Sequence, residues 1–580
     1  MNDVSRIPTR DFLGRYLGPQ RARVLLLAAL LLTSIALDLV GPQILRVFID
    51  RATSGADLTF LAHLAGLFLV VAIIGQAVGV GETSVAENLG QTCTNELRAD
   101  LTGHCLGLDL SFHNSRTPGE LIERVDGDVA NLANFFSRFV VQIVGSAVLL
   151  IAVLALLFAV TLTIGAAVSV VTIIALAVLL RLRDVGVPRW KAARQASAEL
   201  FGFLEERLAG IEDLRSSGAV EHTLRRLAER SRVLFVAERL RELVSTSTGF
   251  SANLLLTLIT VVGLALAAQA FLRGEISIGS VYLVFSYAQL LSRPLDRLTR
   301  QIQDLQRAVA SLARIQQLLA TPSRLAAGGD ALLPRGALAV DVDAVTFGYD
   351  PDDAVLRDLS LTIRAGEVVG LLGRTGSGKT TLARLVARFY DPVAGAIRVG
   401  DVDLRSAAAS ETRRAIGIVS QEIQLFHASV RDNLTLFDPT IADERVVGVL
   451  SDLGLLAWCQ SRPGGLNARL ATGGLSAGEA QLLAFARVFL RDPGLVILDE
   501  ASSRLDPVTE RKIEHALDRL LVGRTAIVIA HRLATVERAD TIVILEAGRV
   551  IEWGPREALA RDATSRFHRL RQLGLEEVLA

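Results

Sequence analysis

Residues 373–381 read GRTGSGKTT and carry the clearest chemical signal in the sequence. They fit the pattern G-x-x-x-x-G-K-[ST], follow the apolar run VVGLL and precede a helical stretch, which is the context that this motif requires. Glycines let backbone N–H groups approach phosphate oxygens, and the start of a helix favours the same anion. We expect Lys379 to reach the terminal phosphates of a nucleotide and Thr380 to hold Mg²⁺.

Residues 495–500 read LVILDE and supply a second set of reactive groups. Four apolar residues predict a buried strand that ends in two carboxylates. We expect Asp499 to organise Mg²⁺ and Glu500 to orient or deprotonate the attacking water of a phosphoryl transfer. A strand that merely ends in solvated acids would look the same, but its position after 373–381 favours nucleotide hydrolysis.

The elements that must hold these groups alternate between strand and helix. Strand-like runs occupy residues 338–347, 367–373, 495–500 and 525–531, with a helical stretch at 380–390. This alternation predicts an α/β domain over residues 338–580, built on a mostly parallel sheet covered by helices. Residues 321–337 are rich in Pro, Gly and Ala and predict a linker.

Residues 1–320 predict an α-helical membrane domain with six spans. Apolar runs lie at 24–45, 58–81, 139–180, 243–272 and 276–292. The uncharged run 139–180 would be about 63 Å long as one helix, roughly twice the hydrocarbon core of a bilayer. We therefore expect two spans there, joined by a hairpin near residues 161–165.

The connections between the spans are unequal. The long charged stretches 82–138 and 181–242 predict helices that extend beyond the bilayer and turn at their tips. Arginines before the first span place the amino terminus, both extensions and the α/β domain on the cytoplasmic side of the cell membrane. Asp38 lies within a span and is a functional-site candidate, although a position near the interface or pairing with a neighbouring helix would also explain it.

Composition agrees with a membrane protein. The 580 residues are 51% hydrophobic, with a mean hydropathy of +0.42, which is unusual for a soluble protein of this length. Lys+Arg and Asp+Glu are balanced at 61 each, which argues against a nucleic-acid partner. Cys93, Cys105 and Cys459 are too few and too scattered for a disulfide framework or a metal cluster.

Taken together, these features resemble an ATP-binding-cassette (ABC) exporter half-transporter, in which six spans are fused to one nucleotide-binding domain. Tyr349 in TFGYD matches the aromatic residue that stacks on adenine, and Gln421 in SQEIQLF matches the Q-loop glutamine. LSAGE at 475–479 matches the signature loop, Asp506 the D-loop and His531 the switch histidine. Residues 111–129 and 210–222 resemble the two regions that contain coupling helices.

The resemblance implies a dimer in which each ATP site joins one subunit's phosphate loop to the other's signature loop. It implies an ATP hydrolase that exports a hydrophobic or amphipathic drug, lipid or peptide by alternating access. The implied catalytic residues are Glu500 and His531, and the implied Mg²⁺ ligands are Thr380, Gln421 and Asp499. The implied ATP-binding residues are Tyr349, Gly373, Arg374, Thr375, Gly376, Ser377, Gly378, Lys379, Thr380, Thr381, Gln421, Ser476, Gly478 and Asp506.

The signature departs from the usual LSGGQ at two positions. Ala477 would cost roughly 1–2 kcal/mol if its position required a positive φ. Glu479 would bring a negative charge near the phosphates. An intact Glu500 beside an altered signature predicts one subunit of a heterodimer, with a homodimer as the alternative.

Two other functions fit the same sequence. One is an importer built on the exporter fold, as some siderophore systems are, and the other is a regulatory subunit that binds ATP without hydrolysing it. The intact Lys379, Asp499, Glu500 and His531 argue against the second. The expected partners are a second half-transporter, membrane lipid and a substrate that the sequence does not identify.

Overall fold

The computed structural model describes residues 14–135, 142–326, 328–350, 353–420, 423–470, 475–499, 507–530 and 536–573. The chain divides into two compact units. One comprises residues 1–106 and 118–321, and the other comprises residues 107–117 and 322–580. The short segment 107–117 thus belongs to the carboxy-terminal unit, although the residues before and after it in the sequence belong to the membrane unit.

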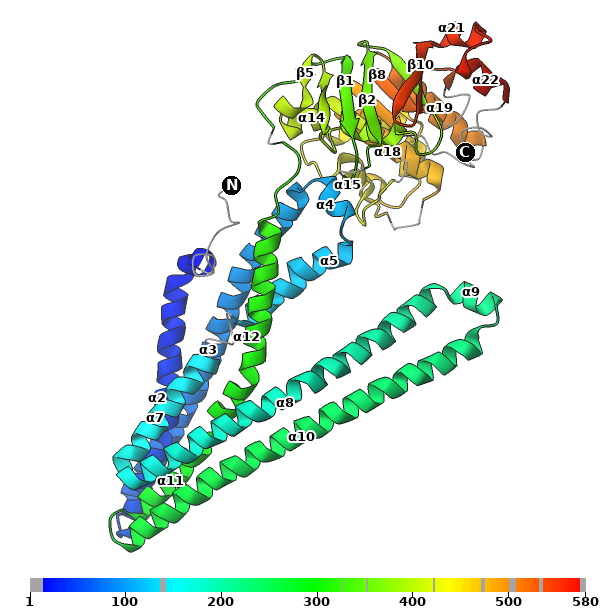
Figure 1. The fold of residues 1–580 in the computed structure, drawn as a ribbon. Helices are drawn as coiled ribbons and strands as arrows, with labels where there is room; N and C mark the ends of the chain where they lie inside the picture. The colour runs from blue at the N-terminus through cyan, green and yellow to red at the C-terminus, as the bar shows by residue number, and fades with distance from the viewer. Residues whose placement is uncertain are drawn as a thin grey trace. The chain divides into compact units, whose positions relative to one another are not determined.

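The first unit is helical (Figure 1). Among the described residues, five helices are long and apolar enough to cross a membrane, and α11 is a shorter apolar helix in place of the expected span 276–292. Its elements are η2 (Gly18–Gln20), α2 (Arg21–Thr53), α3 (Leu58–Gly107), α5 (Pro118–Ile122), η3 (Glu123–Asp128), α6 (Val129–Asn134), α7 (Gly145–Val160), α8 (Leu162–Ala209), α9 (Ile211–Ser216), α10 (Val220–Leu272), α11 (Ile278–Leu290) and α12 (Ser292–Leu319).

The uncharged run 139–180 breaks where the sequence predicts it. Thr161 has an extended backbone (φ −154°, ψ 145°) between α7 and α8, and its side chain accepts a hydrogen bond from the Ile164 amide. Beyond its apolar part, α8 runs beside α10 to a tip formed by α9 (Figure 1). The predicted hairpin and the predicted turn at the tip of the second extension are therefore confirmed.

Partly buried polar contacts connect α2 to α11 inside the membrane unit. Ser277 donates to Asp50 Oδ2 at 2.7 Å, and the Gly279 amide donates to Asp50 Oδ1 at 2.8 Å. The fully buried Tyr287 hydroxyl donates to the Leu39 carbonyl and accepts from Gln43 Nε2 at 2.9 Å. These bonds satisfy polar groups that lipid could not satisfy, so they fix α11 against α2.

The second unit contains two sheets with helices around them (Figure 1). The six-stranded sheet has the order β10-β9-β3-β8-β7-β6 and is parallel except for β10. The four-stranded sheet has the order β2-β1-β4-β5 and is antiparallel. The strands are β1 (Val340–Phe347), β2 (Leu356–Ile363), β3 (Val368–Leu372), β4 (Ala394–Val399), β5 (Val402–Asp403), β6 (Ile416–Val419), β7 (Leu495–Asp499), β8 (Thr525–Ile529), β9 (Thr541–Glu546) and β10 (Arg549–Pro555).

The helices of this unit are the short α4 in residues 107–117 and the helices that connect or follow the strands. They are α4 (Leu110–Asn114), α13 (Lys379–Val386), η5 (Leu404–Ser406), α14 (Ala409–Ala415), α15 (Val430–Thr435), α16 (Asp443–Asp452), α17 (Leu456–Gln460), η6 (Gly465–Asn467), α18 (Ala477–Arg491), α19 (Pro507–Leu521), α21 (Arg556–Arg561) and α22 (Arg566–Leu573). One large core joins the four-stranded sheet, α13 and the inner strands β3, β7 and β8.

The single parallel sheet expected from the sequence is only part of the fold. Strand β1, expected in the same sheet as the others, pairs antiparallel with β2 and β4 instead. Strand β1 alternates buried and accessible residues, whereas β3 and β8 are buried throughout. One-sided burial is typical of antiparallel sheets and two-sided burial of parallel ones.

Candidate functional site

The loop between β3 and α13 is shaped by glycines in the left-handed region. Gly373, Gly376 and Gly378 have φ values of +148°, +81° and +104°. A Cβ at Gly378 would lie 2.5 Å from Leu356 Cδ2, so the neighbouring strand β2 leaves no room for a side chain. The backbone of residues 373–378 can therefore curve as the phosphate-binding motif predicts.

Two buried polar side chains lie within that curve. Ser377 is 6% exposed, and its Oγ has no hydrogen-bond partner among the described residues. Lys379 is also 6% exposed, and its ammonium donates to the carbonyls of Gly373 and Arg374. Burial lowers the pKa of Lys379, and the nearby Asp499 offsets part of that shift. An unpaired hydroxyl and a buried cation at the start of a helix fit a phosphate ligand.

Strand β7 brings the predicted metal ligands together. It lies next to β8, which in turn pairs with β3, so Asp499 ends at the same edge of the sheet as the loop. Thr380 Oγ1 donates to Asp499 Oδ2 at 3.3 Å. A hydroxyl and a carboxylate this close are a donor set that suits a hard cation such as Mg²⁺.

Tyr349 lies at the end of β1 with two other aromatic rings. Its ring makes edge contacts with Phe347 and Tyr390, with ring centres 5.2 and 5.3 Å apart. Its hydroxyl shares a hydrogen bond of 3.2 Å with Thr381 and accepts from Arg384 at 3.3 Å. Tyr349 is 38% exposed, so part of its side chain stays accessible beside the phosphate loop.

Profiles of two protein families match the chain. The ABC transporter transmembrane region matches residues 24–295, and the ABC transporter domain matches residues 356–503. The fatty acid ABC transporter ATP-binding/permease protein of Mycobacterium bovis is 31% identical over 477 residues, which is 80% of this chain and 74% of the relative. The chain is an ABC transporter of the exporter type.

Other relatives cover the transporter almost completely. The ATP-dependent lipid A-core flippase of Syntrophus aciditrophicus is 29% identical over 96% of this chain and 92% of the relative. The structure of a bacterial Atm1-family ABC exporter with ATP bound is 25% identical, with a TM-score of 0.79 over 95% of this chain and 98% of that one. The predicted fold, a helical membrane domain fused to an α/β nucleotide-binding domain, is confirmed. The transporter is a multi-pass membrane protein that binds and hydrolyses ATP.

The signature loop of the transporter starts α18. Ser476 is the N-cap residue and accepts from the Glu479 amide, while Glu479 Oε2 accepts from the Ser476 amide at 2.8 Å. Ala477 is the first helical residue and is not among the residues with positive φ. The strain considered for Ala477 is therefore absent, because the residue already has the ordinary backbone conformation of a helix. Ser476 and Gly478 lie within the same first turn.

The carboxylate of Glu479 has a second donor that the sequence does not reveal. Trp458 of α17 donates its indole N–H to Glu479 Oε1 at 2.7 Å, and Arg462 lies over the Trp458 ring at 4.4 Å. Burial would raise the pKa of Glu479, but the hydrogen bonds from Ser476 and Trp458 hold it below its ordinary value. Glu479 is thus ionised at neutral pH, and its stabilising effect is lost as the pH falls through the lowered pKa.

We expect E479Q, which restores the usual signature residue, to destabilise the transporter. Ser476 and Trp458 donate to different oxygens of the Glu479 carboxylate. A glutamine in the same position turns its NH₂ group towards one of these two donors, so it keeps only one of the two bonds. Loss of one bond to a charged acceptor costs about 1.5–3 kcal/mol, and thermal unfolding of the purified chain would measure it. The same substitution in a W458F chain is the matched control, because phenylalanine lacks the indole N–H that donates to residue 479. Equal losses of melting temperature in the two backgrounds would contradict this account.

Residues 107–117 make several polar and apolar contacts within the nucleotide-binding unit. Asp109 caps α4 and also accepts from the Arg324 amide at 2.5 Å. Asn114 donates to the Tyr390 hydroxyl at 2.9 Å, and Leu110 packs on the core of that unit. Asn114, Tyr390, Tyr349 and Thr381 thus form a continuous series of contacts from the first coupling region to the phosphate loop.

The site residues thus fall into three groups. The first group contains loop 373–381, Asp499 and Tyr349, which contact one another. The second group contains Ser476 and Gly478, which lie at the start of α18. Gln421, Glu500, Asp506 and His531 lie outside the described residues. Sequence reasoning missed Tyr390, Trp458 and Asp109, for which the only signal was their proximity in sequence to the motifs or to the coupling region.

Proposed function

We propose that this transporter is one subunit of a heterodimeric exporter in the cell membrane, with its nucleotide-binding domain in the cytoplasm. Its phosphate loop, Asp499 and Glu500 would form an ATP site with the signature loop of a partner half-transporter. Its own signature loop would complete a slower site on that partner. The substrate would be hydrophobic or amphipathic, in keeping with the lipid and fatty acid named for the relatives.

The proposed roles of residues 373–381 and Asp499 are supported by their contacts, and those of Gln421, Glu500 and His531 by the sequence resemblance alone. Gly373, Gly376 and Gly378 would let the N–H groups of residues 373–381 bind phosphate oxygens, and Ser377 Oγ would gain its missing partner. Lys379 would exchange two backbone carbonyls for phosphate oxygens. Thr380, Asp499 and Gln421 would hold Mg²⁺, which would neutralise charge that develops on the transferred phosphoryl group. Glu500 would orient the water, and His531 would contact the terminal phosphate.

The observation that best supports the heterodimer proposal is the ionised Glu479 in the first turn of α18. Its two donors keep it negative beside Ser476 and Gly478, the groups that would face the partner's ATP. At an effective dielectric of about 20 and a separation of roughly 8 Å, two unit charges repel by about 2 kcal/mol. The unstrained Ala477 favours the second candidate, a homodimer whose signature still functions.

Purification of a tagged chain from its own membranes would decide between the two. We expect cross-linking and mass spectrometry to recover a second half-transporter in a 1:1 ratio. We also expect the chain alone, in lipid nanodiscs, to hydrolyse ATP at least 10-fold more slowly than that complex. A two-fold symmetric homodimer with strong ATPase activity that E500Q abolishes would exclude the heterodimer.

A further inference from the structure

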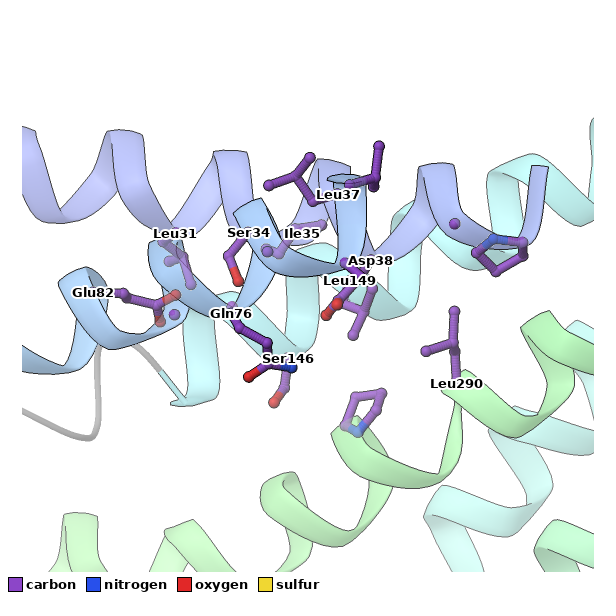
Figure 2. A pocket seen from close by; sticks show the side chains of 18 of the residues that line it. Leu31, Ser34, Ile35, Leu37, Asp38, Gln76, Glu82, Ser146, Leu149 and Leu290 are labelled. Carbon is purple, nitrogen blue, oxygen red and sulfur yellow. The ribbon is translucent and has the colours of Figure 1, made fainter. Parts of the chain in front are cut away.

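Asp38, the acidic residue that the sequence places within a span, lies in the wall of a cavity in the membrane unit. The cavity has a volume of about 650 Å³ and is lined mainly by α2, α3 and α7. Figure 2 shows Asp38 of α2 with side chains of α3 and α7 around the same space. Asp38 has an interaction partner, so it is not a free charge. A cavity between membrane helices is expected of any exporter, so this one adds nothing to the proposed function.

Another cavity lies beside the phosphate loop, in the nucleotide-binding unit, and has a volume of about 260 Å³. Its walls are the start of the loop at Gly373 and Arg374, the end of β9 at residues 544–546, and Arg566 and Leu570 of α22. The cavity separates the start of the loop from α22. On this side, therefore, the helix does not hold the loop by direct packing, and the position of the loop depends on other contacts.

The turn between β9 and β10 supplies such contacts. Glu546 pairs with Arg549 across the turn, and the two residues between them, Ala547 and Gly548, have φ values of +48° and +78°. Positive φ at both central residues is typical of a tight two-residue hairpin turn. The Gly548 amide donates to the Ser377 carbonyl of the phosphate loop at 3.2 Å. The tip of the hairpin is thus hydrogen-bonded to the loop.

Gly548 is enclosed between the loop and β2. Its carbonyl accepts from the Arg357 amide of β2 at 3.0 Å, and a Cβ at Gly548 would overlap the Val355 carbonyl. Where β9 ends, the Leu545 carbonyl lies so close to the loop that a Cβ at Gly373 would overlap it. The hairpin therefore contacts the loop near both of its ends and cannot shift without displacing it.

The hydrogen bond from Gly548 fixes the orientation of one peptide group in the loop. In a trans peptide, the C=O and the N–H of the next residue point in opposite directions. The Ser377 carbonyl points at the turn, so the Gly378 N–H points away from it. Gly378 is the N-cap residue of α13, and N–H groups at the start of a helix bind phosphate.

An ion pair connects the turn to α22. Arg566, the first residue of α22, donates to the two oxygens of Glu546 at 2.8 and 2.7 Å. Glu552 of β10 accepts from the amides of Arg566 and Phe567 at 3.0 and 2.8 Å, so the hairpin holds the start of this helix at two points. The side chains of Glu546 and Arg566 are 44% and 41% exposed. A pair this exposed contributes little to the free energy of unfolding, so substitutions in it can displace the turn without unfolding the chain.

We propose that the β9–β10 turn positions the phosphate loop for ATP. Gly548 orients the peptide between Ser377 and Gly378 so that its N–H meets a phosphate oxygen, and the pair of Glu546 and Arg566 holds the turn against the loop. Glu546, Gly548 and Arg566 are positioning residues, because they act on ATP through the loop. The inference concerns ATP binding by this chain and does not depend on the choice between heterodimer and homodimer.

Charge-reversal variants of the full-length chain in nanodiscs of uncharged lipid test the ion pair, with the fluorescent analogue TNP-ATP as the probe. Since a hydrogen bond to phosphate is weakened, we expect E546R and R566E each to reduce TNP-ATP affinity about 5-fold or more. The double variant E546R/R566E should recover most of the native affinity. A purely electrostatic effect would instead make E546R bind the anionic probe more tightly, because it adds positive charge.

R561E is the matched control, because it reverses the same charge on the neighbouring helix α21, where Arg561 pairs with Glu557. R561E should bind TNP-ATP as the native chain does. Native or tighter binding by E546R would overturn the proposal, and so would a double variant that binds no better than the single ones.

Hydrogen–deuterium exchange distinguishes a displaced loop from a destabilised domain. In E546R and R566E, we expect faster exchange in the peptide that covers residues 373–381, while β7, β8 and the melting temperature stay as in the native chain. G548A should weaken TNP-ATP binding as the pair variants do. G554A, at a β10 position where a Cβ would make an ordinary 3.5 Å contact with Leu559, should not. Exchange that rises equally in all three segments, or not at all in the loop, would overturn the proposal.

Discussion

Replacing Lys379 by alanine is expected to reduce ATP hydrolysis by at least 100-fold and to weaken ATP binding. The ammonium is almost fully buried and donates to two carbonyls of the loop. A water molecule carries no charge, so it cannot replace the ammonium as a counter-charge for the phosphates. Steady-state ATPase assays and binding of a fluorescent ATP analogue would measure the two effects.

The chain contains a matched control, because it has only three lysines. Lys512 lies on the exposed side of α19, so K512A should leave both properties unchanged. K379R should resemble K379A, since the broad guanidinium fork does not fit where a compact ammonium does. ATPase activity within 3-fold of native in K379A would contradict the assigned role.

Replacing Gly378 by alanine is expected to weaken ATP binding at least 10-fold and to lower the melting temperature. Two costs combine there: a φ of +104°, and a methyl group placed 2.5 Å from Leu356 Cδ2. The backbone strain costs roughly 1–2 kcal/mol, and the overlap adds to it by displacing the loop or β2.

A substitution at Gly366 measures the cost of backbone strain without the cost of steric overlap. It has a φ of +79° and lies in the turn before β3, where an added methyl group would have open space within 4 Å. G366A should therefore cost only the strain, and it should leave ATP binding intact because the turn is outside the loop. Equal effects of G378A and G366A on ATP binding would show that the packing against Leu356 does not shape the loop.

Local features of the fold were predictable from the sequence. The phosphate loop is indicated by three closely spaced glycines at 373, 376 and 378. The break at Thr161 follows because one uncharged helix would be too long for a bilayer. The separate antiparallel sheet was not predictable, because the pairing of β1 with β4 joins residues 48 to 59 positions apart in the sequence.

The same distinction applies to the site. Asp499 follows a buried strand, so its place beside Thr380 could be inferred from strand order. The hydrogen bond from Trp458 to Glu479 could not be inferred from the sequence, because Trp458 approaches Glu479 only after α17 and α18 have packed together. The sequence therefore suggested a damaged signature, whereas the structure contains an unstrained turn with a fully engaged carboxylate.

The membership of residues 107–117 in the nucleotide-binding unit bears on how that unit can be studied in isolation. A fragment beginning at Pro322 would lack the side chain of Leu110, the acceptor for the Arg324 amide and the donor to the Tyr390 hydroxyl. Such a fragment would expose the apolar surface on which Leu110 packs. A soluble version of this ATPase therefore needs residues 107–117 supplied as a peptide or joined through a designed linker.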